Sequence, residues 1–217
     1  MNERFFDLKK DRQDRIINGA MRIFAENGYR HASTDEMVAA AGISKGLLFH
    51  YFKSKKGTWM FLYEYCTRYM LIEMREAERR HGCDFFDMYR QLVKADESVL
   101  RRYPWVPIFL KRADREFDLI KADPEEFPED MKFAVASRRA ALLAEAAKPP
   151  FLSEEDAVKV TQMLEYTRLG LLQELLAQEG AEEKDGEDPE EELSLPLSQR
   201  YGDHLSDYLR TLRRMNL

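Results

Sequence analysis

Residues 33–56 read STDEMVAAAGISKGLLFHYFKSKK, and this stretch decides the fold of the chain. Thr34 precedes a short amphipathic run with two acidic residues in its first turn, where the helix dipole favours negative charge. We expect a helix of about two turns, which Gly42 ends in the left-handed conformation of a C-terminal cap. Ser44 then caps a second short helix over residues 45–52. Two short helices joined by a glycine turn predict a helix-turn-helix, although a plain corner between two helices has the same spacing.

The two faces of the second helix differ in chemistry. Leu48 and Phe52 are four residues apart and therefore lie on one face, which we expect to point inward. Lys45, His50 and Tyr51 are left for the outer face. An outer face with basic and aromatic groups is what a recognition helix needs to contact DNA.

The same stretch resembles a known family. AGISKG at residues 41–46, followed by LFHYFKSK at residues 48–55, closely resembles the DNA-binding signature of the tetracycline-repressor (TetR) family of bacterial regulators. Residues 17–34 are similar to the first helix of that family and its exit, and the resemblance covers residues 12–62, about a quarter of the chain. It implies an all-α fold of about nine helices, a homodimer on a palindromic operator in double-stranded DNA, and a small-molecule effector.

Affinity for DNA comes largely from neutralising the charge of its phosphates. Lysines and the amide groups at helix starts can do this. Lys55 is expected to open the fourth helix, where the resemblance places a phosphate contact, and Tyr51 is expected to reach the DNA backbone through its hydroxyl. Thr34 would cap the second helix and leave amides for a phosphate. Lys45 can donate to guanine, and Leu47 can touch a thymine methyl. The candidate DNA-binding residues are Thr34, Ser44, Lys45, Gly46, Leu47, His50, Tyr51 and Lys55.

The charge of the chain is divided by position. Residues 1–60 carry 11 Lys and Arg against 7 Asp and Glu, whereas residues 61–217 carry 23 against 33, which leaves a net charge of −6. We expect a basic end that faces DNA and an acidic body that repels phosphate. The alternative for each lysine is a solvated surface charge, and His50 either faces the DNA or only borders the groove.

Length and composition limit the remaining possibilities. With 217 residues and 44% apolar content, the chain can form one or two domains with buried cores. No apolar run approaches the ~18 residues that span a bilayer and no signal-peptide pattern is present, so we expect a soluble, cytoplasmic protein without a membrane partner. Two cysteines without a CxxC predict no disulfide framework. Four scattered histidines offer neither a metal site nor a catalytic set, so we expect no enzyme, no cofactor and no metal.

The rest of the chain has helical periodicity and no strand pattern. We expect a helix-turn-helix DNA-binding domain over residues 1–56, with a mobile polar arm at its start, and a helical effector-binding and dimerisation domain over residues 57–217. An acidic segment over residues 179–192 is predicted to be a mobile loop. The expected helices cover approximately residues 10–27, 34–41, 45–52, 55–80, 83–102, 108–123, 129–147, 154–178 and 197–215.

Dimerisation is predicted at the last two helices. The second half of the helix over residues 154–178 is apolar nearly all round, so it must be covered on every side. Together, this helix and the last helix have more apolar surface than a single domain would cover. We expect both to pair with their symmetry copies as a four-helix bundle. The alternative is that they are intramolecular core. The predicted dimer residues are Met163, Tyr166, Leu171, Leu175, Leu205, Tyr208, Leu209 and Leu212.

An effector pocket in the middle helices is implied by the resemblance. Its candidate lining residues are aromatic, and each of them also fits a hydrophobic core: Tyr65, Tyr69, Tyr89, Tyr103, Trp105, Phe109 and Tyr166. A ligand bound there would move the fourth helix and change the separation of the recognition helices. The function that follows is a repressor that a small molecule releases from DNA. The alternatives are an activator of the same fold and a helical adaptor dimer that binds no DNA.

Overall fold

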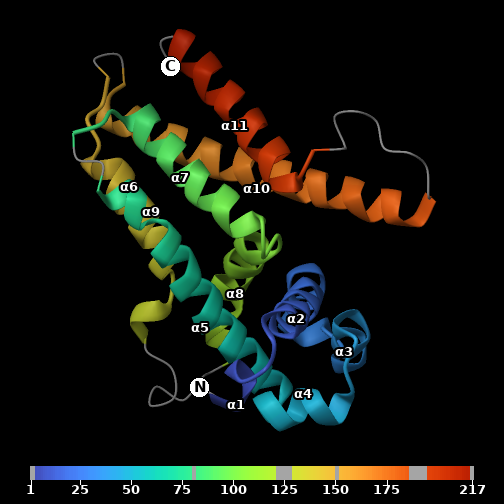
Figure 1. The fold of residues 1–217 in the computed structure, drawn as a ribbon. Coiled ribbons are helices and arrows are strands. Elements are labelled where there is room, and N and C mark those ends of the chain that lie inside the picture. The colour runs from blue at the N-terminus through green and yellow to red at the C-terminus, as the bar shows by residue number, and fades with distance from the viewer. Residues whose placement is uncertain (1–2, 80–81, 121–128, 150–151, 186–194, 216–217) are drawn as a thin grey trace. The chain divides into compact units, whose positions relative to one another are not determined.

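The computed structural model describes residues 3–79, 82–120, 129–149, 152–185 and 195–215, and most of them are helical (Figure 1). Among these residues there is no β-strand, and an isolated backbone bridge joins Asp84 to Ala147. The all-α prediction is confirmed. The helices are α1 (Glu3–Phe6), α2 (Lys10–His31), α3 (Thr34–Ala41), α4 (Lys45–Phe52), α5 (Lys55–Glu73), α6 (Arg75–Glu78), α7 (Phe85–Leu100), α8 (Val106–Ile120), α9 (Ala134–Glu145), α10 (Glu154–Asp185) and α11 (Leu197–Arg214), with a 3-10 turn at Glu129–Met131.

The nine predicted helices are present in this set. The helix predicted over residues 55–80 is divided at Met74 into α5 and α6, and the four-residue α1 is an addition. α10 continues to Asp185, so the loop predicted from residue 179 is wrong for residues 179–185, where Glu, Ala and Lys favour continuation of the helix. Residues 186–192 of that predicted loop lie outside the described residues. No helix in the described part of the chain is both long and apolar enough to cross a membrane.

The backbone packs as two compact units. Unit 1 contains residues 1–69 and 105–134, and unit 2 contains residues 70–104 and 135–217. α8 therefore belongs to the same unit as the N-terminal helices, although it lies far beyond residue 56 in the sequence. The predicted division of function between residues 1–56 and 57–217 stays a prediction.

The core of unit 1 is built around α2, which packs against both α3 and α8 (Figure 1). The apolar residues that recur at three- and four-residue spacing on α2 are buried, as predicted. The ring of Phe24 on α2 lies 6.2 Å from that of Phe109 on α8, measured between centroids. On α5, Trp59 stacks on Tyr63 at 5.1 Å. The ring of Trp59 also lies 6.4 Å from that of Tyr29 on α2 and 6.4 Å from that of Phe109 on α8, so aromatic contacts join α2, α5 and α8.

Three buried charged side chains and one half-buried one form a group in unit 2. Asp96 of α7 is fully buried and accepts hydrogen bonds from Arg139 of α9 (3.0 Å) and from the hydroxyl of Tyr201 of α11 (2.9 Å). Glu165 of α10 lies 3.2 Å from Arg139 and 2.8 Å from Arg168. Burial by itself raises the pKa of Glu165, but the charges of Arg168 and Arg139 outweigh it and lower this pKa to about 2. Glu165 is therefore ionised at neutral pH, and the two arginines are compensated by two carboxylates.

Candidate nucleic-acid interface

α3 and α4 form the helix-turn-helix, and their capping residues explain where each helix begins and ends. The hydroxyl oxygen of Ser33 accepts hydrogen bonds from the amides of Asp35 (3.2 Å) and Glu36 (3.5 Å) at the start of α3. The prediction that Thr34 caps this helix is wrong, because Thr34 is already its first helical residue. Gly42 has φ 62° and ψ 41°, which is the left-handed cap predicted for it.

α4 presents a polar face to solvent. Ser44 caps this helix as predicted, because its hydroxyl oxygen accepts the amide of Leu47 at 3.2 Å. Lys45 and His50 are exposed, and Leu47 is half-buried. Nζ of Lys45 lies 2.8 Å from a carboxylate oxygen of Asp35 in an exposed ion pair. The basic group at the start of the recognition helix is thus on the surface and reaches back to α3.

Tyr51 does not lie on the outer face, where it was predicted. Its ring is buried and meets Phe5 of α1 edge-on, with the centroids 5.7 Å apart. Phe5 is itself fully buried and also packs against Phe52 and Phe61. The segment expected to be a mobile polar arm therefore folds back on α4, and the two phenylalanines at residues 5–6 were the sequence signal for it. The phosphate contact of the Tyr51 hydroxyl stays a prediction.

Lys55 opens α5, as predicted, and the end of α2 holds its ammonium group. Nζ of Lys55 donates to the carbonyl oxygen of Arg30 at 3.2 Å and lies 5.0 Å from the centroid of the Tyr29 ring. Carbonyls at a helix C-terminus carry partial negative charge, and an aromatic face attracts a cation, so both contacts favour this position. An ammonium group has three donors, and the bond to Arg30 leaves donors for a phosphate oxygen.

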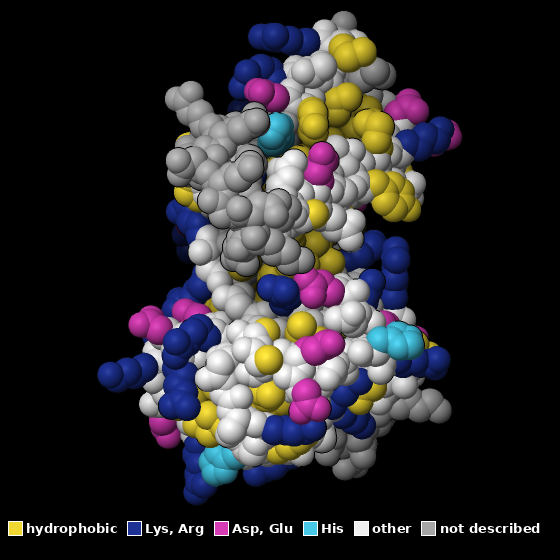
Figure 2. Space-filling view, turned by 90° about the vertical axis from the view of Figure 1, so that its right-hand side faces the viewer, with side chains coloured by type: hydrophobic (Ala, Val, Ile, Leu, Met, Phe, Trp, Pro, Cys, Tyr) yellow, Lys and Arg dark blue, Asp and Glu magenta, His cyan; other side chains and the backbone are white. Residues whose placement is uncertain are grey.

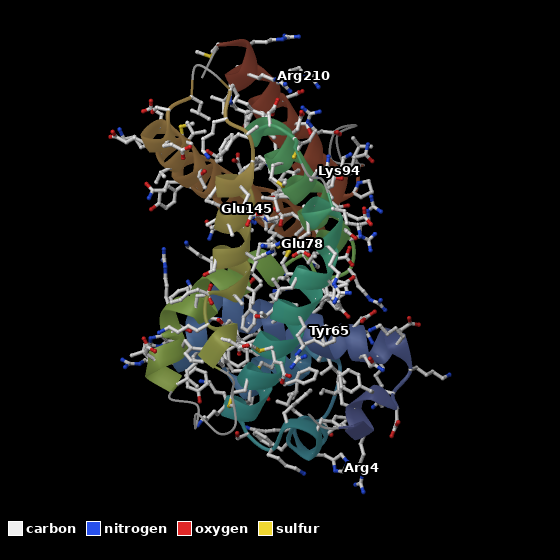
Figure 3. The ribbon with its side chains drawn as sticks, turned by 90° about the vertical axis from the view of Figure 1, so that its left-hand side faces the viewer. Arg4, Tyr65, Glu78, Lys94, Glu145 and Arg210 are labelled. Carbon is white, nitrogen blue, oxygen red and sulfur yellow. The ribbon has the colours of Figure 1, made fainter. Side chains whose placement is uncertain are left out.

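The surface around α4 carries further basic groups. Figure 2 shows Lys and Arg side chains along the lower edge of unit 1, with acidic side chains among them. Arg4 is exposed and points away from the lower end of this unit (Figure 3). A Cβ added to Gly46 would meet no atom of the described residues within 4 Å, so the backbone of α4 is open to a close approach there. Of the predicted contacts, Lys45, Gly46 and His50 lie at this surface.

The segment with this geometry matches a family model. The model of the bacterial regulatory proteins of the tetR family matches residues 16–57, which run from α2 to the start of α5. Over residues 16–57 this chain is therefore similar to the bacterial regulatory proteins of the tetR family. The helix-turn-helix predicted from residues 33–56 is thereby confirmed, and a plain helical corner is excluded.

Two relatives of this chain extend the similarity beyond the helix-turn-helix. It is 29% identical over 119 residues to the HTH-type transcriptional repressor AcnR of Corynebacterium efficiens, which covers 55% of this chain and 56% of that protein. It is 24% identical over 152 residues to IcaR of Staphylococcus aureus strain Newman, the negative transcriptional regulator of the biofilm operon icaADBC. That match covers 69% of this chain and 74% of IcaR. The chain thus spans a little over half the length of the first relative and about three quarters of the second.

Solved structures show that the fold is shared over nearly the whole chain. A TetR family transcriptional regulator from Chloroflexus aurantiacus J-10-FL superposes with a TM-score of 0.51 at 19% identity, covering 98% of this chain and 96% of that one. A TetR-like transcriptional regulator from Rhodococcus sp. RHA1 gives a TM-score of 0.50 at 15% identity, covering 95% and 98%. At such low identity the likeness concerns the fold alone.

The residues predicted at a dimer surface fall into three groups. Met163, Tyr166 and Tyr208 are exposed, by 47%, 71% and 43% of their surface. Leu171 and Leu212 are half-buried. The prediction is wrong for three residues that are buried within unit 2: Leu175, Leu205 and Leu209. They lie on the inner faces of α10 and α11, which pack on each other, and α11 also packs against α7.

The residues predicted to line an effector pocket are divided between the two units. Those of unit 1 are Tyr65, Tyr69, Trp105 and Phe109, and those of unit 2 are Tyr89, Tyr103 and Tyr166. Phe109, Tyr89 and Tyr103 are buried, and the rings of Tyr65 and Tyr69 stack with centroids 6.2 Å apart. Tyr166 is exposed by 71% of its surface.

Tyr89 carries a polar atom that the rest of unit 2 does not satisfy. Its hydroxyl is buried and has no hydrogen-bond partner among the described residues. Burial raises the pKa of Tyr89, so the hydroxyl keeps its proton at neutral pH. A buried hydroxyl without a partner is a position that a ligand or a water molecule can satisfy. The pocket as a whole stays a prediction. No group of three His, Cys, Asp or Glu side chains suited to a metal occurs in the described part of the chain.

Proposed function

We propose that this chain is a repressor that binds a palindromic operator as a homodimer and is released by a small molecule. The observation that carries the proposal is the exposed polar face of α4, with Lys45, Gly46 and His50, inside the segment that matches the TetR family. The names of two relatives, the repressor AcnR and the negative regulator IcaR, favour repression over activation. Those relatives are transcriptional regulators, and no catalytic role is proposed.

Lys45 exchanges its partner when DNA binds. In the free protein its ammonium group is paired with Asp35 in an exposed ion pair. Such a pair contributes only about 0–1 kcal/mol, so replacing the carboxylate by a phosphate or by guanine acceptors costs little. Asp35 also orients the ammonium group before binding. Lys55 supplies a second contact, from the start of α5, to a phosphate on the DNA backbone.

A dimer is required because one short recognition helix buries too little surface for tight operator binding. Two copies related by a twofold axis would place their recognition helices about 34–36 Å apart, or a multiple of that distance. The proposed dimer surface consists of the exposed apolar side chains of α10 and α11: Met163, Tyr166 and Tyr208. Figure 2 shows hydrophobic side chains gathered in the upper part of the view, over the C-terminal helices. A monomer at micromolar concentration in sedimentation would refute the dimer.

The effector must bind the form of the protein that does not bind DNA more tightly than the form that does. Coupling of this kind is typically worth about 1–3 kcal/mol, or roughly 5–150-fold in affinity. The buried hydroxyl of Tyr89 supports a ligand site inside unit 2, since it is a hydrogen-bonding group without a partner. The aromatic residues around the middle helices favour a ligand with an apolar or aromatic body.

The proposal is tested by selection of DNA fragments from the genome that encodes the protein. The purified protein is incubated with short fragments at two salt concentrations, and the retained DNA is sequenced. We expect enrichment of a palindromic site, with affinity that falls steeply as salt rises because phosphate contacts release counterions. No enrichment at low salt would refute DNA binding and leave the helical adaptor as the better hypothesis.

A reporter gene placed behind the recovered site then distinguishes repressor from activator. We expect expression to fall when the protein is present. An increase in expression would replace the repressor by the activator while leaving DNA binding intact.

A further inference from the structure

α2 is interrupted near its end by a glycine. Gly28 has φ 71° and ψ 172°, which is not a helical conformation, although the helix resumes for one more turn up to His31. A break of this kind removes the regular bonds between amides and the carbonyls four residues earlier. The backbone groups that flank Gly28 therefore need partners from outside the helix.

Two charged residues of α8 supply these partners. Nη1 of Arg112 donates to the carbonyl oxygen of Glu26 at 2.9 Å, and Oε2 of Glu116 accepts the amide of Tyr29 at 2.9 Å. Arg112 and Glu116 are four residues apart, so they lie on one face of α8 and reach both sides of the break. A Cβ on Gly28 would lie 2.5 Å from Oε1 of Glu116, which shows how closely this side chain covers the backbone.

Glu116 and Lys55 both contact the last turn of α2, which contains Tyr29 and Arg30. The ring of Tyr29 lies under the ammonium group of Lys55, at 5.0 Å from the centroid, and the carbonyl of Arg30 accepts its hydrogen bond at 3.2 Å. Glu116 therefore fixes the amide of the residue whose ring positions the lysine. All of these residues belong to unit 1, so the chain of contacts from α8 to Lys55 lies within one packed body.

We propose that Glu116, assisted by Arg112, is a positioning residue for the phosphate contact made by Lys55. This inference rests on the proposed DNA-binding function and goes beyond it, because α8 lies outside the residues that match the TetR family model. Glu116 touches no DNA. It holds the last turn of α2 so that Tyr29 and Arg30 present Lys55 to a phosphate, and a shift of α8 releases that turn and weakens DNA binding.

Whether DNA affinity rises or falls when Glu116 is removed distinguishes a positioning role from a general effect of its negative charge. Removal of any carboxylate makes the chain less negative, which by itself strengthens attraction to DNA. Asp118 offers the matched control, since it lies on the same helix and makes an exposed ion pair with Lys132 rather than a contact with α2. Glu116→Ala is expected to weaken DNA binding, whereas Asp118→Ala leaves it unchanged or slightly stronger.

The experiment measures the affinity of each variant for a duplex of about 30 base pairs, roughly three helical turns, chosen among fragments that the parent protein retains. Glu116→Ala is expected to raise the dissociation constant roughly three- to tenfold through loss of a charge-assisted hydrogen bond. Glu116→Gln keeps an acceptor oxygen and is expected to recover part of the affinity. Lys55→Gln is expected to lower the slope of log affinity against log salt by about one.

The combined variant decides whether Glu116 acts through Lys55. In the Lys55→Gln background, Glu116→Ala is expected to change affinity less than about twofold, because the contact that it positions is already gone. Equal affinity of Glu116→Ala and Asp118→Ala in the parent background would overturn the inference while leaving DNA binding intact. A full effect of Glu116→Ala in the absence of Lys55 would also overturn it. Failure of the parent protein to retain any fragment would instead refute the proposed function, and the inference with it.

Discussion

Replacing Gly28 with alanine is expected to destabilise unit 1. Gly28 has φ 71° and ψ 172°, in a region of backbone conformation that essentially only glycine occupies. A Cβ at this position would lie 2.5 Å from Oε1 of Glu116, so the carboxylate must move away from it. The amide of Tyr29, which now donates to Glu116 at 2.9 Å, would lose its partner. The substitution therefore strains the backbone and breaks a contact between α2 and α8.

The two costs can be estimated separately. Holding a residue other than glycine in this conformation costs about 1–3 kcal/mol. Losing a hydrogen bond to a charged group costs about 1.5–3 kcal/mol, and the lower figure applies here because Glu116 is half-buried and water can reach the amide. We expect the free energy of unfolding to fall by about 2.5–4.5 kcal/mol, a large part of the ~5–15 kcal/mol that stabilises a typical domain.

The assay is urea unfolding followed by tryptophan fluorescence. The chain has two tryptophans, Trp59 and Trp105, and both lie in unit 1, so the signal reports the unit that contains Gly28. Gly46→Ala is the control, because a Cβ there meets no atom of the described residues within 4 Å and alanine favours a helix over glycine by about 1 kcal/mol. We expect the control to unfold at the parent's urea concentration or above it. If Gly28→Ala unfolds there too, the break in α2 does not depend on glycine, and the reasoning is refuted.

Three further predictions concern the recognition helix, the C-terminal helices and the buried charges. Lys45→Ala is expected to change the free energy of unfolding by less than about 0.5 kcal/mol and to lower the salt slope of DNA binding by about one, as binding titrations at several salt concentrations would show. Leu205→Ala is expected to cost about 2–5 kcal/mol of stability in urea unfolding, since Leu205 is fully buried, whereas Tyr208→Ala should leave unfolding nearly unchanged and weaken self-association in sedimentation. The pKa of Glu165 is lowered to about 2, so the unfolded chain binds its proton first and stability is lost as pH falls from about 4.5 toward 2. Glu165→Gln should remove that part of the pH dependence, and the exposed Glu155→Gln should leave it unchanged.

The helix-turn-helix was predictable because its geometry is set by residues close together in the sequence. Gly42 and Ser44 occupy positions that few other residue types fill, and both have the predicted conformation and contacts. The cap of α3 was placed one residue late, since Ser33 and Thr34 are adjacent and both carry a hydroxyl. Only the backbone conformation distinguishes them: Ser33 is extended and Thr34 is helical.

The error at Tyr51 has a different origin. Periodicity over residues 45–52 places Leu48 and Phe52 on the inner face of α4 and leaves Tyr51 on the outer face. It does not show whether another segment of the chain covers that outer face. In the structure Phe5 covers it, from a segment more than forty residues earlier in the chain. A contact of this range depends on which segments fold together, and the local pattern of either segment does not contain that information.

The same limit applies to α10 and α11. For the second half of α10 we predicted cover on every side, but within this chain Met163 and Tyr166 are exposed. Apolar periodicity did not say whether the cover of a helix is this chain or a second copy. Leu175 and Leu205 are buried within unit 2, whereas Met163 and Tyr208 are exposed. The division follows from packing of α11 against α7, a pairing of helices that lie about a hundred residues apart.

The buried charges of unit 2 show most clearly what a sequence pattern leaves out. Asp96, Arg139, Glu165 and Arg168 each look like an ordinary solvated helix residue, yet each carboxylate pairs with both arginines: Asp96 at 3.0 and 3.4 Å, and Glu165 at 3.2 and 2.8 Å. The four groups thus form a closed ring from α7, α9 and α10. Desolvation offsets much of the attraction in such a ring, so its contribution to stability is small compared with the cost of removing one member. A slip or rotation of α10 would break the bond of Glu165 to Arg139 on α9 and move Arg168 away from Asp96 on α7, although the pair of Glu165 and Arg168, both on α10, would stay together. The ring therefore favours one packing of these three helices over its alternatives.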